Sequence, residues 1–471
     1  MSVTKRVGLL AGAATLSLTG ASLADVTAGA QSDSDRIAAL EAQVAEFRAM
    51  QSSDYMTEAR ADQIRGLVQD VLADADTRAS LLQGGPTAGH DGHFFLASPD
   101  GNYRLNVGGL IQAGFVYNNR DNDGGADDEN RWGFEMKRTQ LTFWGHVVNP
   151  NWMYKIEGEF SRGETNDGDA VHLYSDASSP SSSECSFCLL DAWIAHNCGN
   201  GLIVYVGQFL APYLHENFGV DDQYSLAYDR SAVNEFFTSG YIQGIMLHYR
   251  QDVWELWGSY DDGIRSANTT ALSYDTEYSF HLRANWLIAG TWDQQMQHTS
   301  PRGQEFGARV GGAIRYSVQE YGTAGPAPTG EATVFGWTVD GSVHFGGASI
   351  MGAIIGNHVD YEVAGFADPE QIAFMVQGGF YLTDEWEIFG RFEWADADLT
   401  GVEDLSLLTV GVNYYFAGQQ VKWTADIVYG LEEVDGYFTG RFNTGDLVGL
   451  VPDAAGQDGQ FALRTQLQLI F

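Results

Sequence analysis

The last twelve residues of the chain, Gln460–Phe471, constrain its fold most strongly. Residues Phe461, Leu463, Thr465, Leu467, Leu469 and Phe471 form one largely apolar face, and Ala462, Arg464, Gln466, Gln468 and Ile470 form a mostly polar one. A period of two is that of a β-strand. A strand with one apolar face, one polar face and a terminal aromatic is typical of the closing strand of a transmembrane β-barrel. An ordinary strand of a soluble antiparallel sheet shows the same period, so the rest of the chain must distinguish the two.

Composition excludes several classes of protein. The chain has 471 residues, enough for two or three ordinary domains or for one large barrel with accessory segments. Its 56 glycines fit poorly with a helical bundle, and its 13% aromatic content fits poorly with disorder. A formal charge of −37 disfavours nucleic acid as a partner, because a phosphate backbone requires a cationic surface.

The N-terminal residues 1–24 have the pattern of a secretory signal peptide. Lys5 and Arg6 provide the positive start, residues 7–18 the apolar run, and Ser22-Leu23-Ala24 the small-residue cleavage site. No later segment has an apolar run of 18 residues, so a helical membrane span is not predicted. An exported chain of this kind enters a membrane only as a closed barrel.

Three cysteines, Cys185, Cys188 and Cys198, are an odd number for an exported chain. Cys185 and Cys188 could close a small local disulfide, and this alternative stays open. A zinc site needs four ligands and the chain has no second cysteine pair, so the sequence predicts no metal site and no cofactor. If 189–197 is a strand, Cys198 lies beyond disulfide reach of Cys188.

Residues 31–82 have a helical pattern. Ile37, Leu40, Val44 and Phe47 follow a 3–4–3 spacing that forms a heptad seam. The narrow seam favours a coiled coil between copies of the chain, and the alternative is a single amphipathic helix that packs on its own barrel. Residues 83–92, rich in glycine, are predicted to be a flexible linker.

From residue 93 to the end the period changes to two. The pattern predicts sixteen strands at 103–118, 133–148, 152–162, 187–197, 202–211, 241–250, 253–261, 278–289, 305–317, 334–345, 348–360, 371–382, 385–397, 404–416, 420–432 and 460–471. Their connections alternate between short and long, and only 290–304 is long where a short turn is expected. The outward faces are apolar with aromatic ends, as in Trp386, Ile388, Phe392 and Trp394. We therefore predict that 93–471 is an all-β, 16-stranded antiparallel transmembrane β-barrel.

Several segments within 137–250 resemble a known family. They are Lys137–Gly145, Trp152–Phe160, Leu190–Ile194, Val206–Pro212, Tyr228–Ser231 and Gly244–Leu247. Their order and spacing resemble the phosphate-selective porin O and P family of outer-membrane channels. The resemblance implies a sixteen-stranded trimeric porin whose loop after the fifth strand folds into the pore. In this chain that loop is 212–240.

The loop carries five acidic residues and one basic residue: Glu216, Asp221, Asp222, Asp229, Arg230 and Glu235. Charges that face an opposing wall focus the electric field and set ion preference, so these residues are the candidate pore constriction. The alternative is a surface loop whose charges are solvated. Arg230 has a second interpretation as a structural residue that pairs with Asp229 or with a carboxylate of the wall.

Alternation along the strands also predicts the charges of the pore wall. The basic candidates are Arg138, Lys155, Arg283, Arg309, Arg315, Arg391, Lys422 and Arg464, and the acidic ones are Glu157, Glu159, Glu387, Glu393 and Asp426. Phosphate channels of the resembled family use Arg and Lys tracks, with a Lys after Gly-Gln-Phe, where this chain has Leu210. The acidic segment 121–129 is interpreted as a solvated loop, with bridging of divalent ions to surface glycolipid as the alternative.

Together these patterns predict a water-filled channel for passive diffusion of small hydrophilic solutes and ions, with weak cation preference or none. The alternatives are an anion- or phosphate-selective channel and a structural barrel that tethers the outer membrane through its helical arm. No catalytic motif is present, so no enzyme is predicted. The expected partners are the lipid bilayer of the outer membrane, two further copies in a homotrimer, and small ions and solutes, but no nucleic acid. The arm would lie in the periplasm, and Phe471 would act as the assembly signal.

Overall fold

The computed structural model describes residues 33–52, 66, 86–120, 129–161, 188–264, 266–269, 271, 276–321, 330–362, 367–440 and 448–471. The expected signal peptide, most of the acidic segment 121–129 and Cys185 lie outside these ranges. The chain divides into two compact units, Met1–Leu81 and Leu82–Phe471.

In the first unit the predicted helix is confirmed as α1 (Asp33–Ser52). Its heptad residues Ile37, Leu40 and Val44 are about half exposed, at 56%, 59% and 48%. Residues 53–65 and 67–82 of the expected arm lie outside the described ranges. The coiled coil therefore stays a prediction. Among the described residues no helix is both long enough and apolar enough to cross a membrane.

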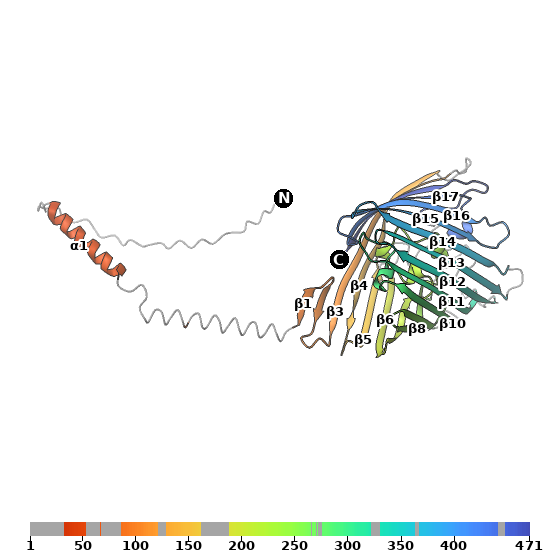
Figure 1. The fold of residues 1–471 in the computed structure, drawn as a ribbon, viewed down its shortest axis with the longest axis horizontal. Helices are drawn as coiled ribbons and strands as arrows, with labels where there is room; N and C mark the ends of the chain where they lie inside the picture. The colour runs from red at the N-terminus through yellow and green to blue at the C-terminus, as the bar shows by residue number, and fades with distance from the viewer. Residues whose placement is uncertain are drawn as a thin grey trace, which may run out of the picture. The chain divides into compact units, whose positions relative to one another are not determined.

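The second unit is dominated by one large antiparallel sheet (Figure 1). Its strands are β1 (Thr87–His90), β2 (Phe94–Ala97), β3 (Arg104–Asn119), β4 (Asn130–His146), β5 (Trp152–Glu159), β6 (Cys188–Gly199), β7 (Leu202–Leu210), β8 (Tyr241–Arg250), β9 (Trp254–Asp261), β10 (Thr276–Ala289), β11 (Gly307–Tyr321), β12 (Gly330–His344), β13 (Ala348–Tyr361), β14 (Glu370–Tyr381), β15 (Trp386–Asp396), β16 (Leu405–Tyr415), β17 (Val421–Gly430) and β18 (Phe461–Ile470). Short helices are α3 (His215–Phe218), η1 (Asp222–Tyr224), α4 (Ala232–Phe237), η2 (Asp293–Met296) and α5 (Gly436–Gly440).

The last strand closes the sheet into a barrel. β18 pairs antiparallel with β3 from Phe461↔Asn119 to Ile470↔Leu110. Phe471 continues the pairing, since its amide donates to the carbonyl of Gly109 at 3.1 Å and its carbonyl accepts from the Gly109 amide at 2.9 Å. Because β18 pairs with β3, the sixteen strands β3 to β18 form a closed sheet. A sheet that spans a membrane must be closed, since unpaired backbone groups cannot be satisfied in lipid. The predicted 16-stranded barrel is confirmed, and each predicted strand end lies within four residues of the observed one.

The linker prediction over 83–92 is wrong in part. Thr87–His90 forms β1, which pairs with β2 in a hairpin, and β2 pairs with the first residues of β3, from Phe94↔Val107 to Ala97↔Arg104. β18 ends opposite Leu110, so it does not pair with the first residues of β3. These residues pair with β2 of the hairpin instead. Backbone pairing with β2, which is itself paired with β3, orders Thr87–His90 in a glycine-rich segment that local sequence alone favours as a loop.

The two faces of the wall follow the predicted alternation. In β18 the outward Leu467 is 52% exposed, whereas the inward Gln468 is fully buried. The outward face of the barrel is apolar, and the inward face carries the polar and charged residues. The short connections lie at one rim, called the short-turn rim below, and the long ones lie at the other, called the long-loop rim.

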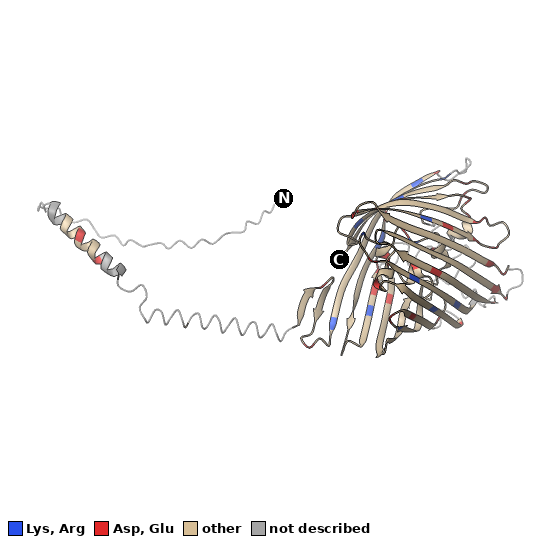
Figure 2. Ribbon diagram, in the orientation of Figure 1, with Lys and Arg blue, Asp and Glu red and all other residues tan. Residues whose placement is uncertain are grey.

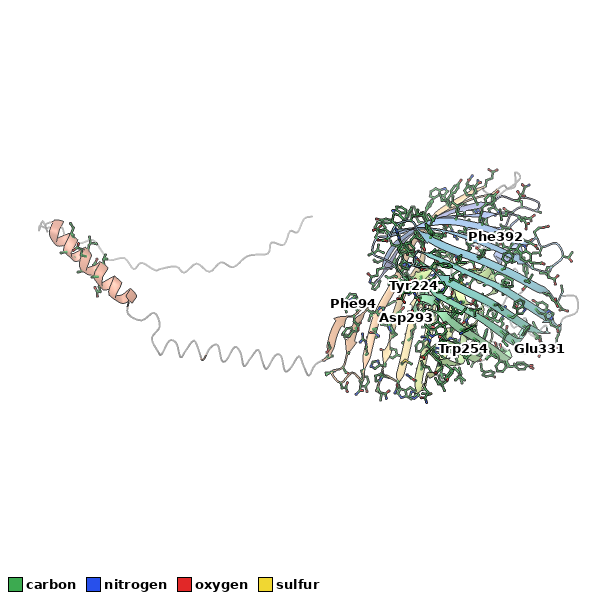
Figure 3. The ribbon with its side chains drawn as sticks, viewed as in Figure 1. Phe94, Tyr224, Trp254, Asp293, Glu331 and Phe392 are labelled. Atoms are coloured by element: carbon green, nitrogen blue, oxygen red, sulfur yellow. The ribbon has the colours of Figure 1, made fainter. Side chains whose placement is uncertain are left out.

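Two connections fold inward and contact inward-facing side chains of the wall. The first is 211–240, which contains α3, η1 and α4 and is here named the infolded loop; it includes Tyr224, which Figure 3 labels. The second is 290–304, the connection that breaks the alternation, and it includes the labelled Asp293. The hydroxyl of Thr299 in this inner turn lies 2.8 Å from the Tyr381 hydroxyl and 2.9 Å from the Glu387 carboxylate, within hydrogen-bond distance of both. The exception in the sequence pattern therefore marks a turn that packs inside the barrel.

The cysteines differ in their state. Cys188, the first residue of β6, is disulfide-bonded, and Cys198 near the end of the same strand is free and exposed.

Candidate functional site: the barrel lumen

Apolar packing holds the infolded loop to one side of the lumen. The helix α4 begins at its cap Ser231, whose hydroxyl accepts from the Asn234 amide at 3.0 Å. Phe236 and Phe237 on this helix are buried in a cluster with small and branched residues of the wall, among them Ala373, Ala395 and Leu407. Phe236 also contacts Phe438 of α5, with ring centroids 5.0 Å apart. Small wall residues such as Ala395 leave the space that these aromatic rings fill.

Wall cations bind the backbone of the loop. Arg283 donates to the Tyr213 carbonyl at 2.7 Å, Arg315 to Phe237 at 3.0 Å, Arg391 to Asp229 at 3.0 Å and Lys422 to Ser225 at 2.9 Å. These four residues were predicted as pore wall, and their side chains do face inward. Their N–H groups hold the loop in place, because each charged group donates a hydrogen bond to a buried backbone carbonyl.

Two of these four cations also pair with carboxylates, as do two further arginines of the wall; Figure 2 marks basic residues in blue and acidic ones in red. Arg283 and Arg309 both contact Asp340 at 2.7 Å, and Arg464 contacts Asp426 at 2.7 Å. Arg391 lies 3.4 Å from Glu216 of the loop and 3.9 Å from Glu393. Sequence reasoning missed Asp340, although its even position on β12 places it on the inward face and could have identified it. This side of the lumen is therefore close to neutral.

A β-bulge on β4 directs two cations at the loop. The register shifts between Gln112↔Arg138 and Ala113↔Met136, so one residue of β4 is extra. As a result Lys137 and Arg138 both reach Asp229, at 2.6 and 3.4 Å. Sequence alternation alone placed Lys137 on the opposite face from Arg138, so it was not among the predicted wall residues.

Asp222 connects the loop to the same strand. It lies 3.1 Å from Arg138 and 2.6 Å from Arg230. Burial raises the pKa of Asp222, but the two guanidinium groups outweigh burial and lower it to about 2. Arg230 thus has a structural ion pair, as one interpretation expected, but its partner is Asp222 of the loop and not Asp229 or a wall carboxylate.

The end of the loop is fixed by a serine, a histidine and an aspartate. Ser239 Oγ lies 2.9 Å from His281 Nε2, and His281 Nδ1 lies 2.9 Å from Asp261 Oδ2. The order of groups is that of a nucleophile, a base and an orienting acid. Ser239 and His281 are fully buried, however, and Arg315 also donates to the serine hydroxyl at 3.1 Å. A substrate has no access to this oxygen, so the three residues anchor the loop to β9 and β10.

Solvent reaches the lumen on the opposite side. The inward side chains of β10 to β18 are almost all buried, whereas those of β4 to β9 include the partly exposed Lys155, Glu157, Trp193, Tyr205 and Trp257. In the infolded loop the least buried segment is Phe218–Tyr224, where Asp221 is exposed. The loop thus packs against the wall of β10 to β18 and leaves its 218–224 segment opposite a partly solvated wall.

Three carboxylates gather on this solvated side, here named the acidic cluster: Glu157, Asp191 and Asp221. Lys155 Nζ lies 2.6 Å from Glu157 and 2.7 Å from Asp191, and Asp221 lies within electrostatic range of the same ammonium. One ammonium and three carboxylates give the cluster an excess of negative charge when all are ionised. Sequence reasoning identified Glu157 and Asp221 but missed Asp191, whose position two residues before Trp193 on β6 places it on the same face.

The other predicted residues have more local contacts. Glu159 accepts from the amides of Thr139 and Ser161 at 2.7 and 2.8 Å, so it ends the β4–β5 pairing and does not oppose a basic residue. Glu235 is partly exposed and accepts from Asn234 at 3.2 Å. Phe471 lies at the short-turn rim, where its ring covers Gly109. A Cβ on Gly109 would lie 2.4 Å from that ring, which explains the glycine.

Comparison with known proteins identifies one matching family and several solved structures with a similar fold. The family model of phosphate-selective porin O and P matches residues 105–432. The outer membrane channel DcaP of Acinetobacter baumannii is similar with a TM-score of 0.50 at 12% identity, over 78% of this chain and 97% of that chain. OmpT of Vibrio cholerae gives 0.49 at 14% identity, over 78% and 98% of the two chains. A mutant of Rh. blastica porin gives 0.40 at 12% identity, over 78% and 100%. No curated protein matches the sequence.

Proposed function

The chain belongs to the phosphate-selective porin O and P family of outer-membrane channels, and from this premise we propose that it forms a water-filled diffusion pore with weak cation preference. Small hydrophilic solutes and ions pass between segment 218–224 of the infolded loop and the wall of β4 to β9. The infolded loop is the constriction. The observation that carries this proposal is the acidic cluster, where three carboxylates face a single ammonium on the solvated side of the lumen.

The pairing of the basic side chains in the lumen supports a preference for cations over anions. A phosphate-selective pore needs basic groups that are free to bind an anion. In this chain Arg283, Arg309 and Arg464 pair with carboxylates, and Lys422 donates to loop carbonyls. Leu210 follows Gly207-Gln208-Phe209, where the phosphate channels of the resembled family have a lysine. The phosphate preference in the family name is therefore not carried over to this chain.

The assembly that we propose is a homotrimer in the outer membrane, with α1 in the periplasm. An OmpT structure of Vibrio cholerae is described as a trimer form. The exposed heptad residues Ile37, Leu40 and Val44 would be covered if three copies of α1 formed a coiled coil. We propose no enzymatic role, because the two serines beside His281 and Asp261, Ser239 and Ser259, are both buried.

Reversing one charge of the acidic cluster tests the proposed path. Asp221→Lys changes the local charge by two units, and at an effective dielectric constant of 20–80 each unit alters the energy of an ion ~6 Å away by roughly 1–3 kcal/mol. Two units give about 2 kcal/mol or more for K⁺ and the opposite change for Cl⁻, so we expect the K⁺ to Cl⁻ permeability ratio, measured from the zero-current potential, to fall by about tenfold or more even after screening by salt. Asp384→Lys, on an exposed turn of the short-turn rim, is the matched control and should change the ratio little. Equal ratios in Asp221→Lys and the unaltered chain would show that ions do not pass Asp221.

A further inference from the structure

The solvated side of the lumen carries a set of aromatic rings that the proposed pore does not explain. Trp193 of β6, Tyr205 of β7 and Trp257 of β9 face inward on neighbouring parts of the wall, and Phe218 of the infolded loop faces them. The ring centroids of Trp193 and Tyr205 are 5.0 Å apart, those of Tyr205 and Trp257 6.1 Å, and those of Phe218 and Trp257 4.9 Å. These four rings are named the aromatic strip.

The strip is accessible and has a defined shape. All four residues are partly exposed, unlike the large inward side chains under the infolded loop. The planes of Trp193 and Tyr205 meet at 77°, so the two rings form an open corner. Trp257 is held in place by His248, which stacks on it at 3.5 Å with planes 3° apart and is itself bonded to Glu255 at 2.9 Å. The strip is therefore pre-organised.

The strip adjoins the acidic cluster. Lys155 is the cross-strand partner of Trp193, and Asp191 lies two residues before Trp193 on the same face of β6. Cross-strand partners and same-face neighbours lie about 5–8 Å apart, so a ligand of a few ångströms can touch both groups. On the loop, Phe218 precedes Asp221 by three residues. Carboxylates and ring faces thus border the same part of the path.

Rings and carboxylates together favour one class of ligand. An aromatic face attracts a cation within about 6 Å of its centroid, and aromatic corners bind quaternary ammonium groups in particular. The carboxylates add attraction for a positive charge and repel an anion. We propose that the aromatic strip and the acidic cluster form a binding site for organic ammonium ions within the permeation path. This inference rests on the proposed pore, and it names organic ammonium ions as a class of solute that binds inside that pore.

The test uses the full chain in planar bilayers with KCl as the current carrier and benzyltrimethylammonium as the probe. We expect the probe to reduce the K⁺ current saturably, whereas benzyl alcohol and benzenesulfonate, which have the ring without the positive charge, leave it unchanged. Trp193→Leu should weaken the apparent affinity for the probe by about 2- to 30-fold, the range for loss of one cation–π contact. Trp193→Phe, which keeps a ring, should weaken it less.

Trp286→Leu is the matched control, because Trp286 lies on the outward face of β10 and is 44% exposed. It should leave the affinity for the probe unchanged. Absence of block in the unaltered chain overturns the site, as does equal block by benzenesulfonate or an unchanged affinity in Trp193→Leu. The proposed function has a separate readout, since its failure would appear as an anion-preferring zero-current potential in KCl without any probe.

Discussion

Replacing residues 213–238 with a short Gly-Ser linker should raise the single-channel conductance severalfold and remove most of the ion preference. The replaced segment contains α3, η1, α4 and Asp221, and most of its residues are buried between the walls of the barrel. The barrel should still close, because Ala211 donates to the Gly240 carbonyl at 3.0 Å and the linker joins two ends that already lie together. Ser239 and its bond to His281 are retained.

The matched control for this deletion is insertion of the same linker between Ala455 and Gly456, in the connection between β17 and β18 at the long-loop rim. Ala455 and Gly456 are both exposed, so the insertion should leave the conductance unchanged. Both variants are measured in planar bilayers under the same salt. If the deletion left both conductance and zero-current potential at the values of the unaltered chain, the loop would not be the constriction.

Removing Phe471 should reduce the amount of barrel in the outer membrane strongly while the channels that do form conduct normally. The residue contributes two backbone hydrogen bonds to Gly109 and packs its ring on that glycine. Hydrogen bonds of about 1 kcal/mol each and a partly buried aromatic ring give a loss of roughly 3–5 kcal/mol in the free energy of closure. Its side chain lies outside the lumen, so the permeation path is unaffected.

Phe345→Ala is the comparison for the effect of Phe471. Phe345 is an equally large aromatic residue just after β12, at the same short-turn rim, and it is 52% exposed. The measurement is the amount of folded barrel in outer-membrane fractions, followed by single-channel recording of the purified protein. Full insertion of a chain without Phe471 would contradict both the closing role of the residue and its proposed role as an assembly signal.

Much of the fold follows from local pattern alone. A period of two fixes which residues face lipid, so the sixteen strands and the inward position of Arg464, Gln466 and Gln468 could be predicted. Closure of the last strand on the first follows from an even strand number and the cost of a free edge in lipid. The infolded loop was expected from the family resemblance and not from the period.

The pairing of charges could not be read from the sequence, because it depends on contacts between distant segments. Asp340 meets Arg283 across 57 positions of the chain, and Asp426 meets the loop amide of Tyr228 across 198. The bulge that brings Lys137 to Asp229 breaks the alternation on which the wall prediction relied. The inner turn 290–304 was visible only as an exception in length, and its side-chain contacts with β12, β14 and β15 depend on the closed barrel.

The zero-current potential across a planar bilayer in a KCl gradient tests the central claim most directly. K⁺ and Cl⁻ have nearly equal mobilities in water, so the sign of the potential reports the net field on the path. Because the acidic cluster lies on the solvated side and the wall cations are paired, we predict that the dilute side becomes positive, as K⁺ crosses ahead of Cl⁻. A dilute side that becomes negative would mean an anion-preferring pore and would contradict the assignment of Glu157, Asp191 and Asp221 to the path.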